Sequence, residues 1–155
     1  MQRGAVIQGS YRYCLTRCLR SDAPTVAFVM LNPSRADGQQ DDPTLRRCIG
    51  FAQAWGFGAL KVVNLFAYRT AQPKQLRQAN DPVGQENDRY IQAAAEQSDR
   101  VVVAWGNQGC WRDRNQAVLT LLNNVELYCL GLTQTQQPRH PLYVRGDQCL
   151  QKYEI

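Results

Sequence analysis

The chain has 155 residues, of which 44% are hydrophobic and 20% are charged, a balance typical of one globular domain with a sizeable core. Its apolar runs are far shorter than the ~20 residues that cross a bilayer, and its N-terminal residues lack a signal-peptide pattern. We therefore predict a single cytoplasmic α/β domain covering residues 1–155, with no membrane contact. The sequence does not define an oligomeric state.

The six cysteines do not form the pattern of a disulfide framework or a metal site. Cys14 and Cys18 have the spacing of half a metal site, but no second pair and no nearby histidine completes four ligands. Without a secretion signal, reduced thiols are expected. We predict no metal and no cofactor.

The first half of the chain contains two strand patterns and one helix pattern. Tyr11–Leu19 alternates apolar and polar residues, which predicts a half-buried strand. Thr25–Leu31 is a continuous apolar run, typical of a strand covered on both faces. A helix is predicted from Pro43 to about Trp55, because Asp42 is a suitable N-cap and proline suits the first helical position.

The second half alternates strands with helices. The predicted strands are Leu60–Phe66, Arg100–Trp105 and Glu126–Leu130, and the predicted helices are about Gln85–Gln97 and Arg112–Leu122. Residues 67–84 are long for a connection and are a candidate functional loop. This order predicts a three-layer α/β/α sandwich with a central, mainly parallel four-stranded sheet, plus an N-terminal strand or hairpin.

Hydrogen-bonding residues lie within or after each predicted parallel strand. In order, these are Asn32-Pro33-Ser34, then Asn64 with Phe66, Tyr68 and Arg69, then Trp105-Gly106-Asn107, and finally His140, the one histidine of the chain. Ligands of open parallel sheets bind outside the carboxyl ends of the strands. The sequence therefore predicts a cleft at this edge that Asn32, Asn64 and His140 share.

Each of these residues also has a purely structural interpretation. An Asn-Pro pair often bonds its own backbone in a turn, and His140 before a proline can simply shape a loop. Asn64 lies between Val63 and Leu65 in a predicted strand, where asparagine is disfavoured, so its amide needs either a ligand or a neighbouring backbone as its partner.

Two resemblances extend these predictions. The segments "MLNPSRADGQQDDPTLRRC", "DPVGQEND", "VVVAWGNQG" and "PRHPLYV" resemble a bacterial and phage family catalogued only as a domain of unknown function. More distantly, a strand followed by Asn-Pro, a strand with an asparagine and a late His-Pro resemble the uracil-DNA glycosylase superfamily. Met30 occupies the position of a glycine in that superfamily, and the cysteines that bind iron–sulfur in some branches have no counterpart.

The second resemblance implies a uracil-DNA-glycosylase-like fold and roles for several residues. Asn32, in the turn with Pro33 and Ser34, would position the attacking water. Asn64 would contact the edge of the base, and His140 would support the leaving base. Phe66 or Tyr68 would stack on the base.

Charged residues near the predicted cleft complete the candidate site. Asp37 is our candidate for a general base or for a carboxylate that balances charge on the sugar, while Asp41 and Asp42 also suit a solvated loop and a helix cap. The net charge of +5 permits contact with phosphates, and Arg46 and Arg69 are candidate phosphate ligands.

Three functional hypotheses remain open at this point. The first is a hydrolase that cleaves the N-glycosidic bond of a nucleobase in DNA or in a nucleotide. The second is a module that binds a nucleotide or modified base without cleaving it. The third is a phosphate-handling enzyme that uses Arg46, Arg47 and Arg69, although no glycine-rich nucleotide fingerprint accompanies them. The partner predicted by the first two hypotheses is a nucleic acid or a nucleotide.

Overall fold

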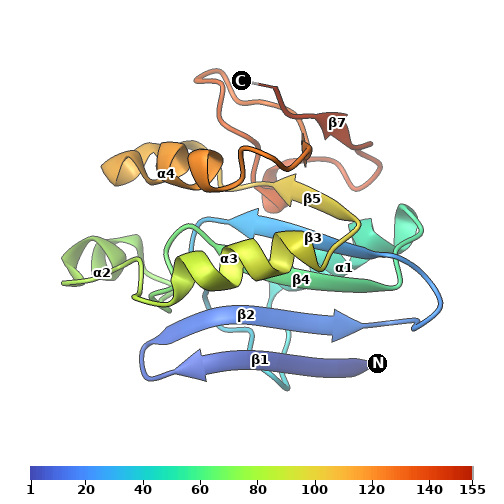
Figure 1. Ribbon diagram of the computed structural model, residues 1–155, viewed down its shortest axis with the longest axis horizontal. Helices are drawn as coiled ribbons and strands as arrows, with labels where there is room; N and C mark the ends of the chain where they lie inside the picture. Colours follow the sequence, from blue (N-terminus) through green and yellow to red (C-terminus); the bar gives the residue numbers. More distant parts are fainter. Residues whose placement is uncertain (155) are drawn as a thin grey trace.

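The computed structural model describes residues 1–154 and contains a seven-stranded mixed sheet (Figure 1). The strand order across the sheet is β1-β2-β4-β3-β5-β6-β7. The strands are β1 (Gln2–Gln8), β2 (Tyr11–Cys18), β3 (Thr25–Met30), β4 (Ala59–Asn64), β5 (Arg100–Val103), β6 (Leu127–Cys129) and β7 (Gln151–Lys152). The helices are α1 (Pro43–Ala54), α2 (Pro73–Gln78), α3 (Asn87–Glu96) and α4 (Arg114–Leu121), with 3-10 helices η1 (Asn107–Asp113) and η2 (Pro141–Tyr143).

Strands β3, β4, β5 and β6 form the parallel centre of the sheet. The apolar run of β3 lies between β4 and β5, and Val26, Ala27, Phe28 and Val29 are at most 1% exposed. A strand buried on both faces needs such a run. The carboxyl ends of the parallel strands therefore meet at one edge, as the sequence predicted.

Helices cover both faces of this sheet, so the domain has three layers. In Figure 1, α3 lies in front of the sheet and α1 behind it. The apolar side of α1, including Leu45, Cys48 and Phe51, packs with one set of strand residues, while residues of α3 and α4 pack with the other set. The predicted start of α1 is confirmed: the Asp42 carboxylate accepts the backbone N–H of Leu45 at 2.8 Å.

The predicted α/β class is correct, but the sheet is larger than four strands plus a hairpin. The N-terminal hairpin β1–β2 joins the sheet through antiparallel pairing of β2 with β4, and β7 pairs antiparallel with β6 at the other edge. The connection after β4 is also not a simple loop, because it contains α2. Over residues 1–154, no helix is both long and apolar enough to cross a membrane.

Candidate functional site

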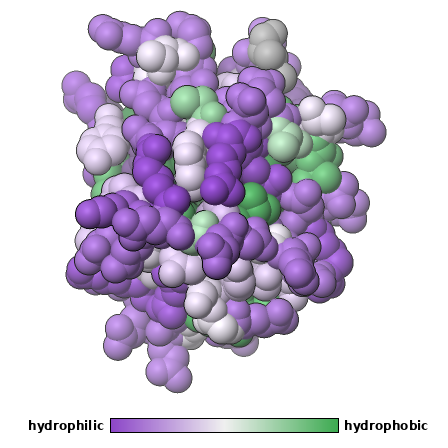
Figure 2. Space-filling view, turned by 90° about the vertical axis from the view of Figure 1, so that its left-hand side faces the viewer, coloured by the Kyte–Doolittle hydropathy of each residue, from purple (hydrophilic) through white to green (hydrophobic). Residues whose placement is uncertain are grey.

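A cleft of about 470 Å³ opens at the carboxyl edge of the parallel strands. Figure 2 views the molecule from this side, where polar side chains cover most of the face and apolar groups appear in small patches. Residues from β3, β4 and the segments after β3, β5 and β6 line the cleft. The structure thus brings Asn32, Asn64 and His140 to one place, together with Ser34. We call the deeply buried lining residues Arg12, Met30, Val62 and Asn64 the floor.

Asn64 ends β4 and presents an amide with a free donor in the floor. Its side chain is 2% exposed, and its Oδ1 accepts from Arg12 Nη2 at 3.5 Å. Its Nδ2 has no hydrogen-bond partner among residues 1–154. The backbone carbonyl of Asn64 accepts from Asn87 Nδ2 at 2.9 Å, which holds the end of the strand in place. A buried amide donor without a partner is costly, so this group is suited to contact a ligand.

Arg12, which the sequence analysis did not single out, is the buried cation of the floor. It lies near the start of β2 and is 4% exposed. Its Nη1 donates to the backbone oxygen of Ala36 at 3.0 Å, and its Nη2 donates to Asn64. Burial lowers the pKa of Arg12 from 12.5 to about 10, partly opposed by the negative charge of Asp42. The guanidinium thus stays charged at neutral pH inside a poorly solvated site.

The Asn32 amide is held in one orientation by backbone carbonyls. Its Nδ2 donates to the oxygen of Thr70 at 2.9 Å and to that of its neighbour Pro33 at 3.1 Å, with the oxygen of Tyr68 at 3.5 Å. Three surrounding acceptors require the nitrogen at this end of the amide. The Oδ1 atom is therefore the part of Asn32 that can accept a hydrogen bond from a water or a ligand.

His140 contributes a neutral imidazole to the cleft. Its Nδ1 accepts the backbone N–H of Leu142 at 3.2 Å, so the neutral ring carries its proton on Nε2. Burial lowers the pKa of His140 below 6.5, with a smaller opposite effect from Asp42. At neutral pH the ring can therefore donate one hydrogen bond from Nε2 without bringing a positive charge.

Arg47 of α1 fixes the segment that carries His140. Its Nε donates to the carbonyl of Pro141 at 3.2 Å, and its Nη2 donates to the carbonyl of Val144. A guanidinium used in this way is a structural tie between α1 and η2. Arg47 is therefore not available as one of the three arginines that the phosphate-handling hypothesis requires.

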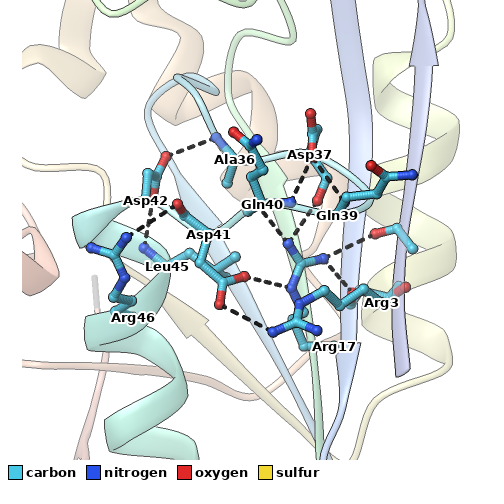
Figure 3. A network of polar contacts seen from close by, with 12 residues as sticks. Arg3, Arg17, Ala36, Asp37, Gln39, Gln40, Asp41, Asp42, Leu45 and Arg46 are labelled. Atoms are coloured by element: carbon cyan, nitrogen blue, oxygen red, sulfur yellow. Dashed lines mark hydrogen bonds and ion pairs between the residues drawn. The ribbon is translucent and has the colours of Figure 1, made fainter. Parts of the chain in front are cut away.

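Asp42 is the carboxylate that lines the cleft. Its Oδ1 caps α1 and its Oδ2 accepts the N–H of Ala36 at 3.1 Å. Figure 3 shows the loop that precedes it, which Arg17 of β2 ties down through Asp41 and through the backbone oxygens of Asp37 and Gln40. The loop therefore holds Asp42 rigidly beside the cleft.

Asp37, our predicted catalytic carboxylate, does not line the cleft formed by the described residues. Its Oδ1 accepts the backbone N–H groups of Gln39 and Gln40, both at 2.8 Å, and these bonds lower its pKa. A carboxylate stabilised in its charged form is a poor proton acceptor at neutral pH. The acidic residue that lines the cleft is therefore Asp42 and not Asp37.

The predicted stacking residues also lie elsewhere. Phe66 is fully buried and packs against Trp111, with ring centroids 5.0 Å apart, while Tyr68 packs edge-on against Tyr11 at 6.2 Å. Pro33 is buried in the turn outside the lining. The aromatic rings beside the cleft are instead Trp105, which is 1% exposed, and Tyr143, which is 77% exposed.

The two predicted phosphate ligands do not reach the cleft in the described part of the chain. Arg69 donates to the backbone oxygens of Ser34 and Arg35, each at 3.0 Å, so two of its N–H groups are used within the protein. Arg46 is exposed on α1. The exposed arginine of the lining is Arg139, next to His140 in the chain.

Within the described residues, the thiols and carboxylates do not come together as a metal centre. All six cysteines are free, including Cys14 and Cys18. Among residues 1–154, no group of three or more His, Cys, Asp or Glu side chains is placed to hold a metal ion.

The fold and the cleft define a class of protein: a three-layer α/β domain with a cleft at the carboxyl edge of its parallel strands, the position at which open α/β sheets bind their ligands. The chain belongs to the family described as "Protein of unknown function (DUF1643)", whose model matches residues 12–142. That range includes every cleft residue discussed above except Tyr143. No curated protein and no solved structure shows a significant match to the chain.

Proposed function

We propose that this protein is a uracil-DNA-glycosylase-like hydrolase that cleaves the N-glycosidic bond of a nucleobase in DNA or in a nucleotide. One observation carries the proposal: Asn32, Asn64 and His140, which lie at the end of or after three different strands, line a single cleft. These are the residues that match the Asn-Pro, strand asparagine and His-Pro positions of that superfamily. The cleft volume of about 470 Å³ lies within the range of small-molecule sites.

The reaction requires charge stabilisation on both sides of the bond that breaks. The electron pair of the glycosidic bond moves to the base nitrogen, and positive charge develops on the sugar. The oxygen of a water molecule then bonds to the anomeric carbon, and its proton passes to the departing base or to solvent. The Nδ2 of Asn64 and the Nε2–H of His140 are donors that stabilise the base as it leaves.

The other polar groups of the cleft serve the water and the sugar in this scheme. The Oδ1 of Asn32 orients the water, because its Nδ2 is already held by Thr70. The Asp42 carboxylate balances the positive charge of the sugar, as carboxylates do in glycoside hydrolysis. Both groups are fixed by backbone hydrogen bonds, so neither must reorganise during the reaction.

A second candidate function is binding of a nucleotide or modified base without cleavage. One observation favours it: both oxygens of Asp42 already accept backbone N–H groups, at 2.8 and 3.1 Å. Such a carboxylate has fewer lone pairs left to accept a hydrogen bond from an attacking water. Binding alone needs only the donors of the floor and His140.

Single-turnover assays distinguish the two functions. The substrates are oligonucleotides and nucleotides that contain uracil, hypoxanthine or modified bases, and the products are separated from intact substrate by chromatography. We expect base release from at least one of them. The variants Asn64→Leu and His140→Ala should lower the rate by about a hundredfold or more, the typical effect of removing one stabilising donor.

The matched control is Arg20→Met, because Arg20 is an exposed arginine that follows β2 at the opposite edge of the sheet. This variant should keep the wild-type rate. If no substrate releases its base while one binds tightly, the binding function replaces the hydrolase. If Asn64→Leu and His140→Ala both retain the wild-type rate, the cleft is not the site of the reaction.

A further inference from the structure

Two arginines on the same strand are both deeply buried but differ in how their donors are used. Arg17 is 0% exposed and every nitrogen of its guanidinium has a partner, including the carboxylate of Asp41 at 2.9 Å. Arg12 is 4% exposed, and none of the ion pairs of residues 1–154 includes it. Its Nε also lacks a hydrogen-bond partner in that range.

The two floor residues that carry unsatisfied donors are hydrogen-bonded to each other. Arg12 and Asn64 are joined by the bond from Nη2 to Oδ1, and both line the cleft. Each has one buried nitrogen without a partner, Nε in Arg12 and Nδ2 in Asn64. Buried polar groups are rarely left unpaired, and a buried charge is normally compensated. The floor therefore has an excess of donors and of positive charge that an acceptor on a ligand would match.

We propose that Arg12 and Asn64 together determine which base this cleft accepts, by binding a carbonyl oxygen of the nucleobase and excluding a base with an amino group at that position. This inference rests on the proposed function, since it takes the ligand to be a nucleobase. An amino group would place donor against donor. A carbonyl oxygen would instead accept from the floor, and it would carry part of the negative charge that a departing base acquires.

Because His140 is neutral, Arg12 and not His140 supplies the positive charge in the buried part of the cleft. His140 donates from Nε2 without a positive charge, because its Nδ1 is occupied by the N–H of Leu142. Arg12 is then the buried positive charge of the lining. Arg12 is thus a specificity-determining residue for the base, separate from the residues that handle water and sugar.

The test compares free bases that differ at this group: uracil with cytosine, and hypoxanthine with adenine. Affinities are measured by isothermal titration calorimetry at fixed pH and salt. We expect the wild-type protein to bind each carbonyl base at least about tenfold more tightly than its amino counterpart, the range of one hydrogen bond to a charged group. The Arg12→Met variant should lose this preference, whereas the Arg20→Met control should keep it.

A second variant keeps the test decisive if Arg12→Met does not fold. Asn64→Asp preserves the shape of the side chain, gives Arg12 a buried carboxylate partner and puts an acceptor in place of Nδ2. We expect this variant to be at least as stable to heat as the wild type, because it compensates the buried charge. Its preference for uracil over cytosine should be abolished or reversed.

The outcomes separate this inference from the proposed function. Three results would overturn the role of Arg12 and Asn64, even if base release is observed. They are equal binding of carbonyl and amino bases by the wild type, no binding of any of the four bases, and an unchanged preference in Asn64→Asp. Conversely, an Arg12-dependent preference without base release supports the inference and leaves the protein as a binding module.

Discussion

Replacing Arg17 by methionine should strongly destabilise the protein, because this side chain holds the loop beside the cleft. Arg17 is fully buried. Its guanidinium donates to Asp41 and to the backbone oxygens of Thr16, Asp37 and Gln40 at 2.6–3.0 Å, and the loop that it binds is shown in Figure 3. Methionine keeps the apolar stem but leaves these acceptors without their donor.

The expected loss follows from the burial of the pair. Removing one partner of a buried ion pair costs about 3–5 kcal/mol. The Asp41 side chain retains 17% exposure, so water can partly solvate it in the variant, and the lower end of the range applies. A loss of about 3 kcal/mol in a chain of this length corresponds to roughly 6–12 °C in Tm.

Urea denaturation at pH 7, followed by circular dichroism, measures this loss. The control is Arg20→Met, because Arg20 and Asp22 form an ion pair with 65% and 80% exposed side chains and such pairs contribute about 0–1 kcal/mol. The two variants should therefore differ by about 2 kcal/mol or more at an unchanged m-value. If Arg17→Met loses less than about 1 kcal/mol, the loop does not depend on this network and the reasoning is wrong.

Three further predictions concern packing, protonation and charge. Gly109→Ala should lower the free energy of unfolding by about 1–3 kcal/mol, because the new Cβ would lie 2.1 Å from Cδ1 of Trp105. The same clash should change the near-ultraviolet circular dichroism. The control Gly50→Ala has open space around its Cβ and should be neutral or stabilising. The one histidine, His140, should titrate below pH 6.5 by NMR. The unfolded state then binds the proton more tightly than the folded state. The contribution of neutral His140 to the free energy of unfolding is therefore present above pH 6.5 and is lost as the pH falls toward the pKa of His140 in the folded state. A measured pKa of His140 at or above 6.5 would contradict this. Finally, the net charge of +5 predicts that binding of an oligonucleotide weakens steeply with salt, whereas a flat dependence would favour a free nucleotide as the ligand.

The placement of the cleft was predictable from sequence because strand periodicity and topology determine it. The apolar run before Asn32 and the strand that ends at Asn64 are parallel neighbours in β3 and β4. Their carboxyl ends must therefore meet, whatever the side chains do there. The N-cap of α1 was predictable for a similar reason, since Asp42 followed by proline satisfies local backbone donors.

Arg12 was missed because its burial depends on distant residues. The alternation in Tyr11–Leu19 indicates a strand with one exposed face, yet Arg12, Tyr13, Cys14 and Leu15 of β2 are all buried. Residues of α3 contact this strand on one side, and the loop residue Ala36 contacts Arg12 on the other. Local periodicity carries no information about such covering segments.

The limits of local sequence patterns also explain why Asp37 was chosen over Asp42 as the acidic group of the cleft, and why α2 and β7 were not predicted. Two adjacent carboxylates and a third close by look alike in sequence, and only the turn made by Gln39 and Gln40 shows which one is turned away. The six residues of α2 and the two of β7 are too short to form a periodic pattern.

The arrangement of Arg12 and Asp42 constrains what the cleft can do. A buried cation in the floor and a fixed carboxylate in the lining stabilise opposite charges, and the breaking of a glycosidic bond creates such a pair, negative on the base and positive on the sugar. A site for a neutral ligand alone would gain nothing from leaving Arg12 without a carboxylate partner, since its buried charge costs stability. Burial lowers the pKa of both Arg12 and His140, and the negative charge of Asp42 partly opposes this shift through space. Asp42 nevertheless forms no ion pair with Arg12 within the described residues. The two charges remain separate, as a ligand that becomes polarised between them requires.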